Sequence, residues 1–383
     1  MLISLLVLLA IVTIAVVWLW PRSPYGPEAQ HDVSVQRLPD NPLIHADLDP
    51  SLSAAALGDG YVNINWPSLL RVPQWIDKPL GKYYLYFSHH KGDRMRLAYA
   101  DDVKGPWRIY EPGVLPLSES GFPTEAVAAS EPNQALKDLW QNFSIFVIRD
   151  YLILNHQASV LDQAARAERG IETAAERAPH IASPEVVVDR QNERLLMFYH
   201  GLEYGTRQLS RVAESVDGIH FSPLDGTIPS PYLRSFNYGE KYYLLGMPGI
   251  LFRADNAAGP FKARRHSLFE PRMRHMGVWL DGATLHVFWS RVGDAPESIL
   301  LSRIDLNPSN WNNWKASEGV EIMRPETDWE GADLGPLPSL RGELAEEANE
   351  LRDPYVFEDD DHQKYLLYVG RGEKAIGIAK LGL

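Results

Sequence analysis

Carboxylates stand at the starts of short apolar strands in this sequence, where a folded chain could bring them together. The stretch 352–354 reads Arg-Asp-Pro, and 183–185 reads Ser-Pro-Glu. A third carboxylate, Glu330, lies in "WEGADLG", on the approach to the last group of strands. Two carboxyl groups that face one substrate can act as a general acid and as a general base or nucleophile. The candidate catalytic residues are therefore Asp353, Glu330 and Glu185.

Aromatic, amide, imidazole and guanidinium side chains occur at similar points of the sequence. Histidine and asparagine can hydrogen-bond the hydroxyl groups of a substrate, tryptophan can stack on a ring, and arginine keeps a neighbouring carboxylate ionised. The residues predicted to bind a substrate in this way are Asn65, Trp66, His89, His90, His180, Arg274, His275 and Arg352. The histidines show no tight ligand spacing such as His-Glu-x-x-His, so no metal site is predicted.

Each of these candidates also has a purely structural explanation. Asp353 precedes a proline and could cap a turn. Glu185 could pair with a neighbouring arginine, and Glu330, which is followed by glycine, could be a loop carboxylate. The histidines could be hydrogen-bonded structural groups. Their shared position in a repeat, however, favours a functional role for the set.

The strands that must position these residues recur five times along the chain. Each unit has an apolar strand, an aromatic strand, an alternating strand and, in the complete units, a fourth strand. The predicted first strands are 67–73, 183–189, 231–236, 274–280 and 353–359. This pattern predicts an all-β fold, a five-bladed β-propeller. The last unit lacks its fourth strand, and residues 34–39 are predicted to supply it, which closes the ring without an exposed edge.

One internal segment does not follow the repeat. Residues 118–179 are rich in Ala, Glu and Arg, which predicts a helical insertion between blades one and two. Such an insertion could be a capping excursion, or it could form a lid or wall over the site. The sequence leaves both interpretations open.

The N-terminus predicts a membrane anchor. Residues 2–20 are 19 uncharged, mostly apolar residues, close to the length that crosses a bilayer. Because no basic n-region precedes them and no small-residue cleavage site follows, an uncleaved transmembrane helix over 1–21 is favoured over a signal peptide. Residues 22–42 are then a Pro-rich linker, and 43–383 are the propeller, a catalytic domain. The bulk of the chain is expected outside the cytoplasm, on the strength of the substrate class that the family resemblance given below implies.

Composition excludes several other classes of function. The net charge is −13, and no basic cluster interrupts it, so a nucleic-acid partner is not expected. There is no cysteine, which rules out disulfides and thiol chemistry. An apolar content of 45% is typical of a globular protein with a substantial core.

These motifs resemble the five-bladed propeller glycosidases, the family 43 glycoside hydrolases and their relatives. The resemblance covers about residues 60–383 and is carried by "SPEVVVD", "GKYYLYFSHHKGDRMRLAYADDVKGPW", "WEGADLG" and "DPYVFEDDDHQKYLLY". It implies cleavage of glycosidic bonds by carboxylates at the propeller mouth, without a cofactor. A structural Ca²⁺ in the channel, which some propellers of this kind hold, is left open. Asp353 matches the Asp-Pro of the family, Glu330 matches the Glu-Gly of the general acid, and Glu185 matches an inner-strand acidic position.

The sequence also departs from the family pattern. Blade one, which carries the base as Asp-Pro in those enzymes, reads Asn65-Trp66-Pro67 here, and Arg-Asp-Pro lies in the last blade. The catalytic carboxylates are therefore redistributed around the ring, or one role is lost. The sequence predicts a glycoside hydrolase acting on an oligo- or polysaccharide. The alternatives are a non-catalytic sugar-binding propeller and a glycoside phosphorylase, in which Arg274, His275, His89 and His90 would serve phosphate.

Overall fold

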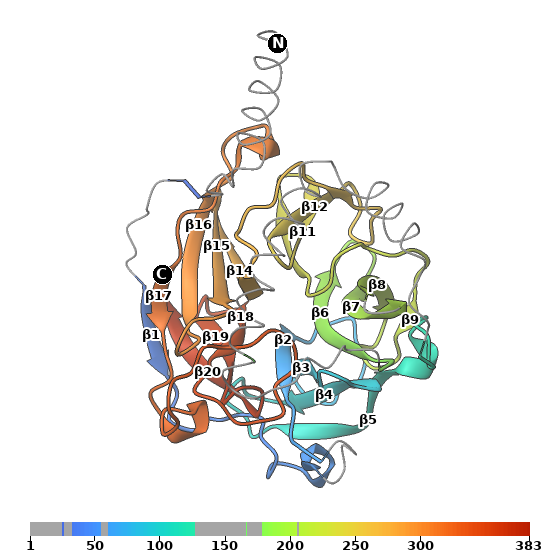
Figure 1. Cartoon of the computed structure of the whole chain (residues 1–383). Coiled ribbons are helices and arrows are strands. Elements are labelled where there is room, and N and C mark those ends of the chain that lie inside the picture. The colour runs from blue at the N-terminus through green and yellow to red at the C-terminus, as the bar shows by residue number, and fades with distance from the viewer. Residues whose placement is uncertain (1–24, 27–32, 55–59, 127–165, 167–177, 205–206) are drawn as a thin grey trace, which may run out of the picture.

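In the computed structural model the chain forms five four-stranded antiparallel sheets around a central axis (Figure 1). The structure describes residues 25–26, 33–54, 60–126, 166, 178–204 and 207–383. Blade I contains β2 (Asn65–Arg71), β3 (Tyr83–Ser88), β4 (Arg94–Ala100) and β5 (Arg108–Pro116). Blade II contains β6 (Ile181–Asp189), β7 (Arg194–Tyr204), β8 (Arg207–Ser215) and β9 (Ser222–Pro223). Blade III contains β10 (Arg234–Tyr238), β11 (Lys241–Gly246), β12 (Ile250–Ala254) and β13 (Lys262–Ala263).

The last two blades complete the ring. Blade IV contains β14 (Met273–Asp281), β15 (Thr284–Arg291), β16 (Ile299–Asp305) and β17 (Val320–Met323). Blade V contains β18 (Arg352–Glu358), β19 (Lys364–Gly370), β20 (Ala375–Gly382) and, from the other end of the sequence, β1 (Ser34–Arg37). The predicted five-bladed propeller is confirmed.

Blade V closes as predicted from its missing fourth strand. β1 pairs antiparallel with β20, from Ser34 opposite Gly382 to Arg37 opposite Ala379. Asn41 extends this junction, because its side-chain amide exchanges two hydrogen bonds of 2.8 Å with the backbone of Ile378. The propeller therefore takes in residues that lie inside the predicted linker 22–42.

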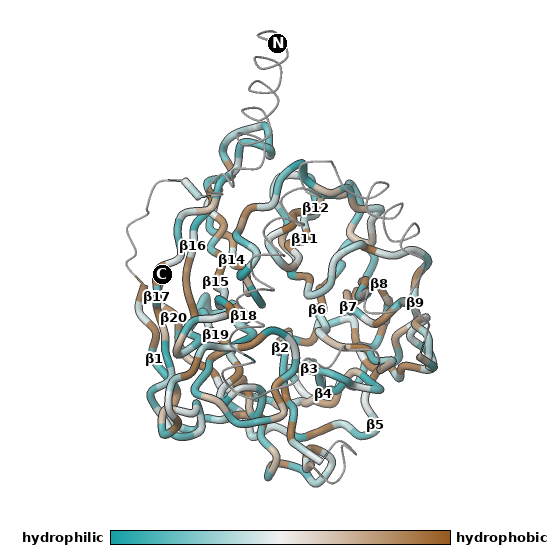
Figure 2. The backbone as a smooth tube through the Cα atoms, in the orientation of Figure 1, coloured by the Kyte–Doolittle hydropathy of each residue, from teal (hydrophilic) through white to brown (hydrophobic). Residues whose placement is uncertain are grey.

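The blades are held together by apolar side chains on both faces of their strands. Every residue of β3 is buried. Tyr84 and Tyr86 pack against blade II, whereas Leu85 and Phe87 pack against blade V. A strand covered on both faces needs apolar residues at consecutive positions, which explains the run "YYLYFS". Figure 2 shows these hydrophobic stretches along the strands and hydrophilic residues in the loops.

Four of the innermost strands begin with a β-bulge. In β2, β6, β14 and β18 the register against the next strand shifts by one residue near the start. Trp66, Ser183 and Asp353 in these bulges have φ of 52°, 58° and 49°, and Tyr232 before β10 has φ of 56°. A bulge redirects side chains, and left-handed backbone in bulky residues is strained and concentrates at functional sites. β10 begins at Arg234, later than the predicted 231.

Two predictions fall largely outside the described part of the chain. Most of the segment 118–179, predicted as a helical insertion, is not described, and its first described residues include only the short 3₁₀ helix η2 (Leu117–Glu119). The predicted transmembrane helix over 1–21 also lies outside it. Among the residues that are described, none belongs to a helix long and apolar enough to cross a membrane.

Candidate active site

The inner strands place side chains in two successive levels of the channel. Side chains two residues apart on a strand point to the same face. We call the residues at the strand starts the mouth layer: Trp66, Ser183, Tyr232, His275 and Asp353. We call the residues two positions further along the channel layer: Ser68, Glu185, Arg234, Gly277 and Tyr355. The two layers differ sharply in chemistry.

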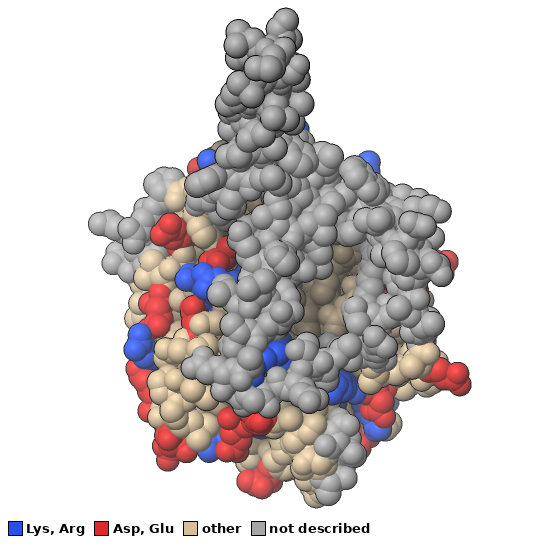
Figure 3. All heavy atoms as spheres, in the orientation of Figure 1, with Lys and Arg blue, Asp and Glu red and all other residues tan. Residues whose placement is uncertain are grey.

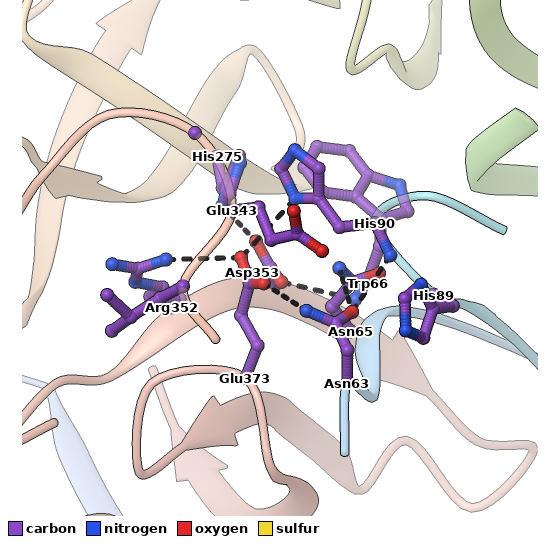
Figure 4. A network of polar contacts seen from close by, with 12 residues as sticks. Asn63, Asn65, Trp66, His89, His90, His275, Glu343, Arg352, Asp353 and Glu373 are labelled. Atoms are coloured by element: carbon purple, nitrogen blue, oxygen red, sulfur yellow. Dashed lines mark hydrogen bonds and ion pairs between the residues drawn. The ribbon is translucent and has the colours of Figure 1, made fainter. Parts of the chain in front are cut away.

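Asp353 is the carboxylate of the mouth layer (Figure 4). It is 1% exposed, its carboxylate pairs with His275 Nδ1, and its Oδ2 accepts the backbone N–H of Trp66 at 3.2 Å. Burial by itself raises the pKa of Asp353, but the charge and hydrogen bond of His275, with Arg274 nearby, together outweigh it and hold the pKa below its usual value. Burial lowers the pKa of His275 in spite of Asp353. Asp353 is thus ionised at neutral pH and paired with His275 Nδ1.

A buried network of ion pairs lies beside Asp353. Arg352 donates to Glu350 Oε2 at 2.7 Å and to Glu373 Oε1 at 3.1 Å. Arg274 donates to Glu297 Oε2 at 3.0 Å. All five side chains are at most 3% exposed. Buried charges of this kind persist only when they are paired and hydrogen-bonded. The three glutamates therefore neutralise the two arginines and fix their positions.

The network continues into blade I through amide side chains. Asn63 Nδ2 donates to Glu373 Oε2 at 2.5 Å, and Asn63 Oδ1 accepts the backbone N–H of His90 and the Nδ2 group of Asn65, at 2.8 and 3.1 Å. Ser88 Oγ donates to Asn65 Oδ1 at 2.6 Å and accepts the N–H of Ser183. Polar contacts therefore run around the mouth from blade II through blades I and V to blade IV.

A further carboxylate reaches the mouth from the loop before β18. Glu343 pairs with Lys91 Nζ, on the turn between β3 and β4. The carbonyls of Leu340 and Gly342, just before it, each accept from Arg274 at 2.8 Å. Glu343 therefore stands between the turn that carries His90 and the strand that carries His275, as Figure 4 shows. Its side chain is 11% exposed, more than any carboxylate of the buried network.

Imidazole and aromatic rings form the other side of the mouth. The Tyr232 ring lies 4.3 Å from His200, 4.9 Å from His275 and 5.3 Å from Trp66, between centroids. His180 lies 5.9 Å from His200. Burial, reinforced by His180, lowers the pKa of His200 well below its usual value. This sector thus presents imidazole and aromatic rings, whereas the sector of blades IV, V and I presents buried ion pairs.

His89 belongs to the same rim but faces blade I's own strands. Burial and the nearby Arg96 lower its pKa to about 3. Its Nδ1 accepts the backbone N–H of Lys91 at 3.1 Å, and its ring lies 5.8 Å from that of Tyr61. His89 is therefore neutral and has a structural contact with the turn that carries Lys91.

Glu185 lies in the channel layer and is saturated by internal partners. Its Oε1 accepts from Ser235 N at 2.9 Å and from Ser235 Oγ at 3.0 Å, and its Oε2 accepts from Arg234 at 2.9 Å. With Arg71 and Glu358, residues at the far ends of β2 and β18, it lines a cavity of about 310 Å³. The structure thus points Glu185 toward the end of the channel opposite the mouth.

Arg234 binds all four other blades. Besides Glu185 of blade II, its guanidinium donates to the carbonyls of Met276 at 2.9 Å, Pro67 at 3.0 Å and Pro354 at 3.4 Å. It also lies 4.2 Å from the Trp66 ring centroid. A Ca²⁺ at this level of the channel does not fit these residues, because Arg234 already supplies the positive charge and takes the carbonyl groups.

Glu330 lies in the short 3₁₀ helix η4 (Asp328–Glu330). Its described hydrogen-bond partners are not residues of the mouth layer. Its Oε1 accepts from Arg37 at 2.7 Å and from Tyr368 at 2.8 Å, and its Oε2 accepts the backbone N–H groups of Glu326 and Thr327. The bond from Thr327 N to Oε2 belongs to a capping box, and with Arg37 and Tyr368 on Oε1 both carboxylate oxygens are satisfied. Glu330 therefore joins η4 to β1 and β19.

The structure brings most of the predicted binding residues together. Those around the mouth are Asn65, Trp66, His90, His180, Arg274, His275 and Arg352, with Asp353 among them. The sequence patterns did not indicate Glu343, Glu350 or Glu373, nor the pairing of Glu297 with Arg274. For Glu373 a signal existed, since it follows the second strand of blade V just as His89 and His90 follow that of blade I.

Comparisons with known proteins place the fold but not the reaction. No family model matches the chain. A protein of Acanthamoeba polyphaga mimivirus, itself uncharacterised, is 28% identical over 375 residues, which cover 91% of each chain. A glycosyl hydrolase from Bacteroides ovatus has a similar structure, with a TM-score of 0.55 at 10% identity over 93% of this chain and 96% of that one. The Bacteroides ovatus xyloglucan PUL GH43B has a TM-score of 0.50 at 11% identity, over 90% of this chain and 53% of that one.

These likenesses confirm the predicted resemblance in fold to the family 43 propellers. At 10–11% identity they do not carry over a substrate or a catalytic residue. The chemistry must be argued from the site itself.

Proposed function

We propose that this protein is a glycoside hydrolase that uses Asp353 as its ionised catalytic carboxylate. One observation carries the proposal: Asp353 occupies a strained bulge at the propeller mouth, buried, and is held ionised by His275 and the Trp66 N–H. A buried carboxylate maintained in its charged form can take a proton from water or attack an anomeric carbon. The fold likeness to glycosyl hydrolases supports this reading.

The contacts of the two mouth arginines favour hydrolysis over phosphorolysis. Arg352 is engaged by Glu350 and Glu373, and Arg274 by Glu297 and two loop carbonyls. A phosphate-binding site needs cationic donors that are free to pair with the phosphate. Phosphate would have to displace buried glutamates, which is costly.

Glu185 and Glu330 have positioning roles in this proposal. Each carboxylate accepts hydrogen bonds from the protein on both oxygens. The partners are not those that contact Asp353. Glu185 fixes Arg234 in the channel, and Glu330 fixes the closure of blade V. Neither is proposed to touch the substrate.

We also propose that residues 2–20 anchor the enzyme in a membrane, with the propeller outside the cytoplasm. The 19 consecutive uncharged residues support this. Resistance of the full-length chain to carbonate extraction and its digestion by protease added outside intact cells are the expected results. Extraction of the chain with peripheral proteins would contradict the anchor.

The catalytic proposal is tested by screening the full-length chain against a panel of aryl glycosides and oligosaccharides, with and without phosphate. Asp353→Asn is expected to lower kcat/KM by roughly 10²–10⁴-fold, the range for loss of a general acid or base. Asp360→Asn is the matched control, because Asp360 is an exposed aspartate at the other end of β18. Phosphate-dependent turnover would indicate a phosphorylase, and sugar binding without turnover would indicate a binding protein.

A further inference from the structure

The loop carboxylate Glu343 has the position that a proton donor needs. The other carboxylates around Asp353, which are Glu297, Glu350 and Glu373, are at most 1% exposed and are held by Arg274 and Arg352. Glu343 is 11% exposed, and its described ion-pair partner is a lysine on an exposed turn. Among the carboxylates described around the mouth, it is therefore the one that can exchange protons with solvent between turnovers.

The loop holds Glu343 in place from both sides. Arg274 binds the carbonyls of Leu340 and Gly342 on one side of it. Lys374 Nζ donates to the carbonyls of Leu344 at 3.3 Å and Ala345 at 2.7 Å on the other. A side chain clamped at its flanking backbone has little freedom to drift, which is what positioning of a reactive group requires.

The arginine that clamps this loop is also the neighbour of His275. Arg274 precedes His275, which pairs with Asp353, and Lys91 follows His90, which faces Glu373 at 3.5 Å. The two residues that hold Glu343 thus belong to the strand and the turn that flank Asp353. Figure 4 shows Glu343 in one group with His90, His275 and Asp353.

We propose that Glu343 is the general acid of the hydrolysis and that Lys91 positions it; this inference rests on the proposed function. Asp353 takes a proton from water as the water oxygen bonds to the anomeric carbon, or the Asp353 carboxylate first bonds to that carbon and water then cleaves the ester formed. The bond between the anomeric carbon and the leaving oxygen breaks, and that oxygen takes the proton of Glu343. One water is consumed. In the first case Asp353 releases its proton to solvent and Glu343 takes one from solvent; in the second the attacking water returns a proton to Glu343.

The leaving group distinguishes this role from a structural one. A good leaving group such as 2,4-dinitrophenolate departs without a proton, whereas a sugar or an alkyl alcohol needs one. Glu343→Gln is expected to lower kcat/KM by roughly 10²–10⁴-fold for glycosides with poor leaving groups and by less than about tenfold for the dinitrophenyl glycoside. Glu347→Gln is the matched control, since Glu347 lies on the same loop, is 54% exposed and pairs with Arg371.

A second readout is the pH profile. The charged and titratable groups that surround Glu343 are Lys91, Arg274, Lys374, His90, His275 and Asp353. Lys91→Met removes the closest positive charge, so the protonated acid persists to higher pH and the alkaline limb of kcat/KM moves upward. In Glu343→Gln that limb should disappear.

The two levels of the proposal fail separately. If the unmodified chain hydrolyses no glycoside, the proposed function falls. If it does hydrolyse one, and Glu343→Gln lowers activity equally for good and poor leaving groups or leaves the alkaline limb unchanged, Glu343 is not the acid. Circular dichroism and thermal unfolding show whether each variant is folded. If Glu343→Gln does not fold, the pH profile of Lys91→Met tests the assignment independently.

Discussion

The mouth layer and the channel layer lie two residues apart on the same strands, yet they differ in how their side chains are paired and in their backbone conformation. In the channel layer Arg234 donates to four blades and Glu185 accepts on both oxygens. In the mouth layer the backbone of Trp66, Ser183, Tyr232 and Asp353 is left-handed. The first arrangement is that of a structural support, and the second is that of a site under strain.

Unsatisfied polar groups mark the same difference. In the described part of the chain, neither ring nitrogen of His200 has a hydrogen-bond partner, nor does Trp66 Nε1, although both side chains are at most 1% exposed. Buried polar groups without partners cost stability and are rare in native proteins. Of the two layers, the mouth layer is thus the one with unfavourable conformations and contacts, and the channel layer beneath is saturated.

Figure 3 adds the surface around these layers. Acidic and basic side chains are interspersed over the described part of this face, with no continuous basic patch visible there. The ordered charges of the described residues are instead the buried ion pairs at the inner strands, such as those of Arg274 and Arg352.

The largest effect on stability is expected from Arg234→Met. Removing one partner leaves Glu185 charged, buried and unpaired, and breaking a buried pair in this way costs about 3–5 kcal/mol of unfolding free energy. Urea unfolding of the single variant and of Arg234→Met/Glu185→Leu provides the measurement. The double variant should recover part of the loss, because no uncompensated charge remains. Equal stability of Arg234→Met and the unmodified protein would show that the channel layer is not a support.

A smaller effect of opposite sign is expected from His200→Leu. Replacing an unsatisfied buried imidazole by an apolar side chain should raise the unfolding free energy by about 1–3 kcal/mol. Ser302→Ala is the contrast, since Ser302 Oγ accepts from Trp289 Nε1 at 3.0 Å and its removal should destabilise. Thermal unfolding of both variants decides the matter. Destabilisation by both would mean that the mouth is satisfied like the rest of the core.

The smallest expected effect is on the loss of unfolding free energy at acidic pH. The pKa of Asp353 is held low in the folded protein despite burial, by His275 and Arg274. A carboxyl whose pKa is lower in the folded state gives stability that is present above its ordinary pKa of about 4 and is lost as the pH falls below it. Unfolding free energies of Asp353→Asn between pH 6 and 3 should therefore fall less steeply than those of the unmodified protein. Parallel curves would show that Asp353 is not held ionised.

Much of the fold could be predicted because it depends on local patterns. The aromatic strands, the turns between them and the five first strands follow from periodicity, and closure by residues 34–39 followed from the count of strands. The starts of the inner strands were less accessible, since a one-residue bulge leaves no periodic signal. The candidate site was predicted in part: Asp353, His275, Trp66 and Arg352 meet, because equivalent positions of a repeat converge on one axis.

The rest of the site depends on contacts between residues far apart in the sequence. The sequence by itself determined which residue types stand at the strand starts, because apolar alternation decides the strands and their repeat decides the ring. Only the tertiary structure decided that Glu185 pairs with Arg234, that Glu330 caps η4, and that Glu343 reaches the mouth. The physical reason is that a carboxylate's role depends on which cations and donors surround it, and long-range packing sets those neighbours.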